Sequence, residues 1–446
     1  MESITKKLAE FAVQSTYGDL PGDVINQAKR CFIDTIGTSL AAAESPSVRV
    51  LTGLVQDLGG EEQASLIGSA FKTTVVNASL VNGAMGHVFD FDDLHNDALT
   101  HTSTVLVPAA LSGGEWKRRN GKEVITSFVV GFEAAVRVSM AAGKGPHQLE
   151  WGWHPTSTMG RIGAAVCFGR LLELDALSMA ASMGIAATTA SGLRRVFGTM
   201  TKHFNAGKPA HDGVLSALLA HRGFSAPTDI FEGDDGLCNV LARRFDGNQI
   251  LDGLGERYEI LNNSFKAYPA CGQTHAVIDA CLDIFRRSSF KPSDIEKVIC
   301  EVNPVAPEVA GKRDPRDPNE AKFSLHYCAA RALMGDVSMR SFRPEEIQKE
   351  DVKKLMKCIE ITTNPAFSIA SAQVEVKTQD GRKTKSKIDG VKGSPSNPMT
   401  DDEMDSKFMD LALPVLKDEE KTKNILHMLR ALETVEDVGS VVRLLA

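Results

Sequence analysis

The sequence predicts a mainly α-helical protein, with a large all-helical domain and a smaller α+β domain inserted before the C-terminal helices. Through the first two-thirds of the 446 residues, apolar residues recur three and four positions apart, which is the period of an α-helix. After Lys266 they alternate over short runs, which is typical of strands, and the helical spacing returns after residue 398. We therefore expect residues 1–265 and 399–446 to form the helical domain and residues 266–398 to form the α+β domain.

The predicted helices share a clear spacing of apolar residues. Pro21 favours the first turn of a helix, and apolar residues follow it three and four apart: Ile25, Ala28, Phe32, Ile36 and Leu40. Residues 122–142 and 175–192 are apolar on almost all sides and rich in Ala, Gly and Ser, so we expect helices buried in a bundle. Residues 401–413 and 419–432 predict two C-terminal helices.

The α+β domain is predicted from short alternating runs. Residues 297–303 alternate like a strand, and residues 374–388 indicate a strand, an Asp-Gly turn and a second strand. Helices are expected after His275 and over residues 323–334 and 351–361. This pattern predicts two helices packed on a small antiparallel sheet.

Composition excludes several classes of protein. A net charge of -7 without a basic block argues against a nucleic-acid surface. No run of 18 apolar residues predicts a membrane span, and the first residues lack the apolar core of a secretory signal. Eight cysteines without a CxxC pair indicate a reducing compartment, so we expect a cytoplasmic protein, with an organelle as the alternative. An anionic substrate would need a local cluster of cations.

Four segments carry polar groups that a helical core would not need. Residues 90–101 hold four carboxylates and two histidines; residues 152–160 place His154 at a helix start; residues 201–211 hold four cationic or titratable groups; residues 266–275 lie where the pattern changes. Each also has a structural interpretation: a solvated loop for the charge run, a cap or core residue for a lone histidine, and an exposed helix connection for residues 201–211.

Templates for other chemistry are missing from the sequence. It contains no phosphate-binding GxxxxGK[ST], no strand-linked GxGxxG, no HExxH and no GxSxG. Cys271 and His275 would supply only two ligands to a metal. An acidic Mg²⁺ site around residues 92–97 would need a second acidic cluster, which is not evident. We therefore expect no metal and no organic cofactor.

Five motifs, in this order and spacing, resemble the MmgE/PrpD family over nearly the whole chain. They are DFDD at residues 90–93, GWHPTS at 152–157, FGTMTK at 197–202, DGVLS at 212–216 and YPACGQTH at 268–275. The family includes 2-methylcitrate dehydratase, cis-aconitate decarboxylase and iminodisuccinate epimerase. The resemblance implies a helical domain with an α+β lid, a homodimer, no metal or cofactor, and a site between the domains for a small di- or tricarboxylate.

The resemblance also implies roles for individual residues. His101 and His154 would give or take a proton, with Asp90 orienting one imidazole and Tyr327 as a further donor. Lys202 and Lys266 would hold substrate carboxylates as positive charges, and His275 would line the same site. These implied residues are the catalytic candidates His101, His154, Asp90 and Tyr327 and the substrate-binding candidates Lys202, Lys266 and His275.

The branches of the family leave the exact reaction open. The spacing within residues 90–101 is closest to the fungal decarboxylases, whereas GWHPTST and FGTMTK are closest to the epimerase. Leu94 replaces a threonine of the animal decarboxylases, and Thr100–Thr104 departs from the dehydratase pattern. A lyase is the leading hypothesis, with the decarboxylase ahead of the dehydratase. The alternatives are an epimerase on an amino-dicarboxylate and a scaffold without catalysis.

Overall fold

The computed structural model describes residues 3–145 and 147–446 in two compact units. The first unit contains the chain up to Ser264, except for Phe89–Phe91, together with Thr400–Ala446. The second unit contains Phe89–Phe91 and Phe265–Met399. The first unit is almost wholly helical and the second is α+β, which confirms the predicted fold class.

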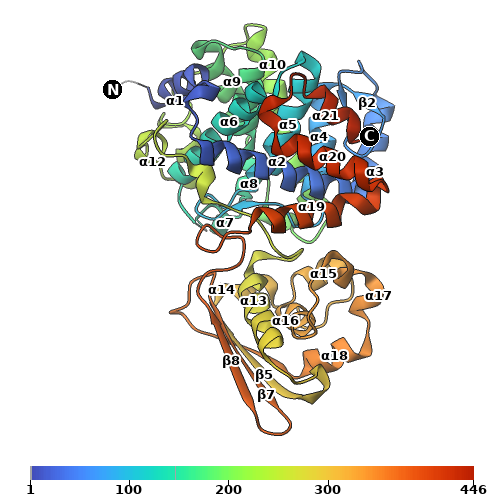
Figure 1. The fold of residues 1–446 in the computed structure, drawn as a ribbon. Helices are drawn as coiled ribbons and strands as arrows, with labels where there is room; N and C mark the ends of the chain where they lie inside the picture. Colours follow the sequence, from blue (N-terminus) through green and yellow to red (C-terminus); the bar gives the residue numbers. More distant parts are fainter. Residues whose placement is uncertain (1–2, 146) are drawn as a thin grey trace. The chain divides into compact units, whose positions relative to one another are not determined.

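Long helices build the core of the first unit, and short ones connect them (Figure 1). Its helices are α1 (Ile4–Gln14), α2 (Gly22–Ala42), α3 (Pro46–Leu58), α4 (Val75–Gly86), α5 (Thr102–Lys117), α6 (Gly121–Ala141), α7 (His147–Glu150), α8 (Pro155–Leu171), α9 (Ala176–Thr188), α10 (Thr201–His221), α11 (Leu237–Ala242), α12 (Asn248–Leu251), α19 (Asp401–Leu416), α20 (Glu419–Arg430) and α21 (Gly439–Leu444). Two short antiparallel pairs accompany them: β1 (Ala64–Ser65) with β2 (Lys72–Thr73), and β3 (Leu94–His95) with β4 (Asn263–Ser264).

The predicted helix starts and burial patterns are borne out in this unit. Helix α2 follows Pro21 and buries the regularly spaced Ala28, Phe32, Ile36 and Leu40. Asn120 caps α6 in a capping box with Glu123, since each side chain accepts the other residue's backbone N–H. Helices α6 and α9 are buried on almost every side, as their small and apolar residues predict.

Helix α8 lies at the centre of this unit, in contact with α5, α6, α9 and α10. Small residues allow the close approach to α6: a methyl group built on Gly131 would lie 2.7 Å from the carbonyl oxygen of Gly163. A buried ion pair joins α8 to α10, with Arg161 Nη1 2.8 Å from Asp212 Oδ2. These contacts hold α8 firmly against α6 and α10.

Helix α6 is long and apolar enough to cross a membrane, judged by length and composition alone. The sequence analysis did not expect any segment to meet this test. The whole apolar window is buried, and Glu133 and Arg137 within α6 form a buried ion pair of 2.9 Å. These features are those of a core helix. The C-terminal helices α19 and α20 pack against α2 in the same unit (Figure 1).

The second unit packs helices against a four-stranded sheet with the order β6-β5-β7-β8. Helices α13 and α16 pack against these strands and form its hydrophobic core with them. Its elements are α13 (Gly272–Arg287), β5 (Ile295–Val302), α14 (Val305–Ala310), α15 (Pro318–Lys322), α16 (Leu325–Leu333), α17 (Pro344–Ile347), α18 (Glu350–Lys357), β6 (Ile359–Thr363), β7 (Ala372–Thr378) and β8 (Lys383–Ile388).

Two predictions for this unit need correction. The helix predicted over residues 351–361 ends at Lys357, because Ile359–Thr363 forms strand β6. This strand pairs in parallel with β5, so the sheet is mixed rather than antiparallel. The predicted β7–β8 hairpin is confirmed, and Gly381 at its turn has a φ of +87°, which favours glycine.

Candidate active site

Two histidines meet one buried carboxylate at the junction of α4 and α5. His87 follows the last turn of α4 and His101 precedes the first turn of α5. Asp92 lies in the loop between them and is fully buried. Its Oδ2 atom is 2.8 Å from His87 Nδ1, in a hydrogen bond, and 3.1 Å from His101 Nδ1. The two imidazole rings meet edge to face with their centroids 4.6 Å apart.

His154 joins this group from the start of α8. The helix begins at Pro155, as the sequence predicts, which leaves His154 at its N-cap. The His154 ring stacks near His87 with centroids 6.0 Å apart, and it meets the Phe197 ring edge to face with centroids 4.8 Å apart. Thr156 Oγ1 accepts a hydrogen bond of 3.0 Å from the backbone N–H of His101. This bond ties the first turns of α5 and α8 together.

Lys202 enters the same region from the first turn of α10. Its Nζ atom lies 5.4 Å from the centroid of the Phe197 ring, which His154 also contacts. The side chain is buried, and its positive charge acts on His87. The fold therefore brings His101, His154 and Lys202 together from three helices of the first unit.

Burial and charge set the protonation of this cluster. Burial is the main cause that lowers the pKa of His87 to about 3, and the charges of Lys202 and His101 add to it against the opposing Asp92 carboxylate. Burial raises the pKa of Asp92, but the charges and hydrogen bonds of His87 and His101 outweigh it and hold that pKa well below its usual range. At neutral pH, His87 is therefore neutral and Asp92 is a carboxylate. His87 therefore interacts with Asp92 as a neutral hydrogen-bond donor.

Asp93, the next residue, belongs to a different buried network. Its backbone N–H donates to Asp34 Oδ2 at 3.1 Å, and its Oδ2 atom accepts from Asn263 Nδ2 at 2.6 Å and from the Ser103 hydroxyl. Lys407 from α19 pairs with Asp34 Oδ1 at 2.7 Å. Burial, followed by the charge of Asp34, raises the pKa of Asp93 to about 7. This network anchors the loop to α2 and α19.

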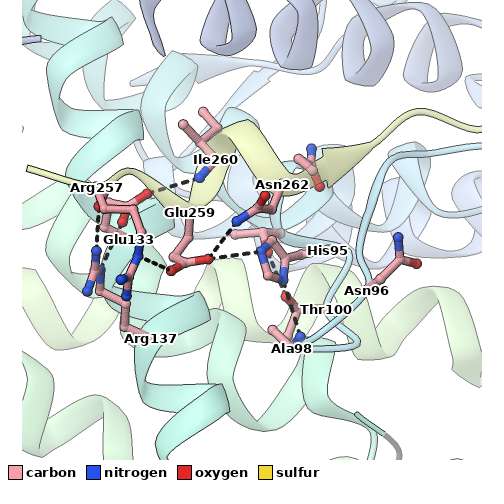
Figure 2. A network of polar contacts seen from close by, with 12 residues as sticks. His95, Asn96, Ala98, Thr100, Glu133, Arg137, Arg257, Glu259, Ile260 and Asn262 are labelled. Carbon is pink, nitrogen blue, oxygen red and sulfur yellow. Dashed lines mark hydrogen bonds and ion pairs between the residues drawn. The ribbon is translucent and has the colours of Figure 1, made fainter. Parts of the chain in front are cut away.

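His95, the second histidine of the predicted segment, has a structural position (Figure 2). Its Nδ1 atom accepts a hydrogen bond from Ala98 N–H at 3.2 Å, and its Nε2 atom faces Glu259 Oε2 at 3.7 Å. This contact with His95 is the first cause that lowers the pKa of Glu259 to about 2. The neighbouring pair of Glu133 and Arg137 extends this network beneath the loop.

Asp90 and Lys266 pair with each other in the second unit. Lys266 Nζ lies 2.7 Å from the backbone oxygen of Asp90 and 3.0 Å from its Oδ1 atom. Asp90 has a φ of +53°, a left-handed conformation in which aspartate is among the tolerated residues. The sequence analysis gave Asp90 the role of orienting an imidazole. In the first unit, the carboxylate that contacts His87 and His101 is Asp92.

His275 and Tyr327 also lie in the second unit, within its packed parts. His275 is in the first turn of α13, and its Nε2–H donates to the Ala270 carbonyl at 3.2 Å. The Tyr327 hydroxyl donates to the Ser341 carbonyl, and its ring is fully buried against Phe342. Burial raises the pKa of Tyr327. The structure places each of these groups in a hydrogen bond within its own unit.

The sequence analysis missed His87 and did not single out Asp92. Side-chain atoms of His87, Asp92 and His101 that could bind a metal all lie within 4.8 Å of one another, a set of three that the sequence analysis did not find. A hydrogen bond already joins His87 to Asp92, and the nearby positive charge of Lys202 opposes a further cation. The available signal was the position of His87 one helical turn before the acidic run.

Comparison with known proteins agrees with the order of the motifs. The N-terminal domain model of the MmgE/PrpD family matches residues 6–249, and its C-terminal domain model matches residues 268–432. The chain is 25% identical to the cis-aconitate decarboxylase of Aspergillus terreus, over 99% of this chain and 96% of that protein. It is 24% identical to the cis-aconitate decarboxylase of Homo sapiens, over 100% of this chain and 95% of that protein. Because the two domain models together span most of its length, the chain belongs to the MmgE/PrpD family.

Proposed function

We propose that this protein is a lyase that acts next to a carboxylate of a di- or tricarboxylic acid, and that it converts cis-aconitate to itaconate and CO₂. The observation that carries the proposal is the cluster in which His101 contacts the buried Asp92 carboxylate, His154 lies near His87 and Lys202 lies over Phe197. Support comes from relatives named cis-aconitate decarboxylase that align with nearly the whole chain.

The reaction requires a cation and a proton donor. The bond between the allylic CH₂ and its carboxylate breaks and releases CO₂. Its electron pair forms the new C=C bond, and the pair of the former double bond moves to the carbon next to the other terminal carboxylate. That carbon takes one proton, so the cis-aconitate trianion and H⁺ give the itaconate dianion and CO₂. Negative charge gathers on the remaining carboxylates before protonation, where a fixed positive charge is most effective.

The residues of the cluster divide this work. Lys202 holds a substrate carboxylate as a point charge, and its burial strengthens that attraction. His101, which Asp92 orients, supplies the proton, and His154 is the second imidazole available for proton transfer. No metal or organic cofactor enters this scheme. Turnover should therefore survive exhaustive chelation; a loss of activity that one divalent ion alone restores would contradict this part of the proposal.

Proton NMR time courses with cis-aconitate, 2-methylcitrate and iminodisuccinate test the proposal directly. The expected result is the appearance of the vinyl signals of itaconate together with CO₂. Turnover of 2-methylcitrate alone would assign a dehydratase instead. The epimerase is a second candidate because the imidazoles of His101 and His154 come from different helices, as two opposed acid–base groups would. No change in any substrate would support a scaffold without catalysis and overturn the proposal.

We also propose that the protein is a homodimer, as the family resemblance implies, and that it is cytoplasmic, as the eight cysteines without a CxxC pair indicate. Light scattering coupled to gel filtration tests the oligomeric state. A single species of twice the 48.1 kDa chain mass is expected, and a monomer at working concentration would contradict it.

A further inference from the structure

His87 takes no part in the proposed reaction, yet it touches the carboxylate at the centre of the site. We propose that His87 is a positioning residue, which holds Asp92 against Nδ1 of His101 and thereby leaves Nε2 of His101 as the nitrogen that exchanges a proton with the substrate. Only this last step rests on the proposed function. Which ring nitrogen of His87 and of His101 carries the hydrogen can be tested without any turnover.

The tautomer of His87 follows from its contacts. Asp92 is ionised, and a carboxylate only accepts hydrogen bonds, so the 2.8 Å bond requires a hydrogen on His87 Nδ1. A neutral imidazole carries one N–H, which leaves a lone pair on His87 Nε2. This atom is fully buried and has no hydrogen-bond partner within residues 3–145 and 147–446. Buried acceptors without a partner are rare and costly. The ring keeps this orientation despite the unpaired Nε2 atom, so the hydrogen bond at Nδ1 is the contact that fixes it.

His101 contacts the same oxygen of Asp92. Its Nδ1 atom lies 3.1 Å from Asp92 Oδ2, so its Nε2 atom points away from the carboxylate on the far side of the ring. Its backbone N–H is held by Thr156 Oγ1. The side chain of His101 is 11% exposed, whereas those of His87 and Asp92 are 0% exposed. Of the three groups, His101 is the one that a substrate can reach.

Two substitutions separate positioning from packing. In His87→Asn, the amide N–H reaches about as far as histidine Nδ1 and can still donate to Asp92, whereas His87→Leu fills similar space without a donor. His95→Leu is the matched control, because it removes a buried imidazole from the same loop but leaves the Asp92 pair in place.

Nitrogen NMR of protein with ¹⁵N-labelled histidine provides the first readout. In the wild type and in His87→Asn, His101 should hold its hydrogen on Nδ1 when neutral, and His87 of the wild type should stay neutral from about pH 5 to about pH 9. His87→Leu should mix the two tautomers of His101. An unchanged His101 tautomer in His87→Leu, or the same change in His95→Leu, would overturn the inference.

Kinetics provide the second readout. His87→Leu should lower kcat by roughly 10²-fold with little change in KM, because a misplaced acid slows chemistry more than binding. His87→Asn should recover most of this loss. Equal losses of kcat in His87→Leu and His87→Asn, with equal shifts in their thermal unfolding temperatures, would assign His87 a packing role and overturn the inference. If the wild type turns over none of the three test substrates, the proposed function fails, while the tautomer measurement still decides the arrangement.

Discussion

Asp92 and Asp93 are neighbours in the chain and both are fully buried, but their carboxyl groups have opposite surroundings. Asp92 faces the imidazoles of His87 and His101, and its pKa is held well below the usual range. Asp93 faces a second carboxylate, Asp34, and its pKa is raised to about 7. One residue is therefore ionised throughout the neutral range, and the other is partly protonated there.

The difference shows that the partners, and not burial alone, decide the charge of a buried carboxyl group. Burial is the largest single influence on both residues and raises the pKa of each. Imidazole donors reverse this effect at Asp92, whereas the charge of Asp34 adds to it at Asp93. The contacts of Asp92 with two imidazoles suit proton transfer next to a substrate. The network around Asp93 anchors the loop to α2 and α19.

The largest expected effect is that of Asp92→Asn. An amide lacks the negative charge that holds both imidazoles at one oxygen of Asp92, so His101 should lose its orientation and its preferred tautomer. We expect kcat to fall by roughly 10³–10⁴-fold, the scale seen when a carboxylate that orients a catalytic histidine is removed. Steady-state kinetics together with thermal unfolding check this. Asp93→Asn is the matched control and should keep kcat within about tenfold. An equal loss in both variants would remove the functional contrast between them.

Much of the fold could be predicted because the long helices carry a regular spacing of apolar residues. Helices α2, α6, α9, α19 and α20 lie where this spacing predicts them. Strand β6 was missed because Ile359–Thr363 directly follows α18 and extends its apolar pattern by only a few residues. A short apolar run of this kind does not distinguish a helix from a strand. Its pairing with β5 is a tertiary contact, which the local pattern does not contain.

The candidate site could be predicted as segments, but the roles within residues 90–93 could not. Which carboxylate faces the histidines depends on the irregular backbone of residues 90–93, which includes the left-handed conformation of Asp90 with a φ of +53°. His87 lies at the end of an apolar helix, where a lone histidine is usually a satisfied core residue. Only the return of the chain at α5 brings His101 to the same oxygen of Asp92.

The next largest effects are expected for the imidazoles of His101 and His154. His101→Ala and His154→Ala should each lower kcat by roughly 10²–10⁴-fold if the residue acts as a general acid or base. Thermal unfolding measured in parallel should show a smaller change than Asp34→Ala, which would leave Lys407 buried without its carboxylate. Turnover like that of the wild type in both histidine variants would refute the mechanism.

A smaller effect is expected for Lys202→Ala, which tests whether the cation only binds. If Lys202 holds a substrate carboxylate equally in the ground and transition states, the loss of this charge-assisted hydrogen bond should raise KM by roughly 10–100-fold and leave kcat nearly unchanged. Lys208→Ala is the control on the same helix, because Lys208 pairs with Asp212 and is partly exposed. A fall in kcat without a change in KM would show that Lys202 acts mainly in the transition state.

The last prediction concerns Asp93 and the pH dependence of stability rather than turnover. The carboxyl group of Asp93 ionises near its ordinary value of 3.8 in the unfolded chain and at about 7 in the folded protein. Between these values the folded protein binds more protons at this group, so its contribution to the free energy of unfolding falls as pH rises. The loss is on the order of a few kcal/mol for a shift of this size. The amide side chain of the variant Asp93→Asn binds no such proton, so the variant lacks this loss. The free energy of unfolding of the variant, measured relative to the wild type, should therefore rise between about pH 4 and about pH 7.

At His87 the pH dependence of stability has the opposite sign, so the wild type must be compared with a variant. Its pKa is about 3 when folded and 6.5 when unfolded, so its contribution to stability rises with pH through this window. A wild-type profile alone therefore mixes two slopes of opposite sign. Urea unfolding of the wild type and of Asp93→Asn at several pH values isolates Asp93, because His87 contributes to both. A difference between the two proteins that stays constant with pH would show that Asp93 is ionised in the folded protein, and the two neighbouring carboxylates would then share one charge state.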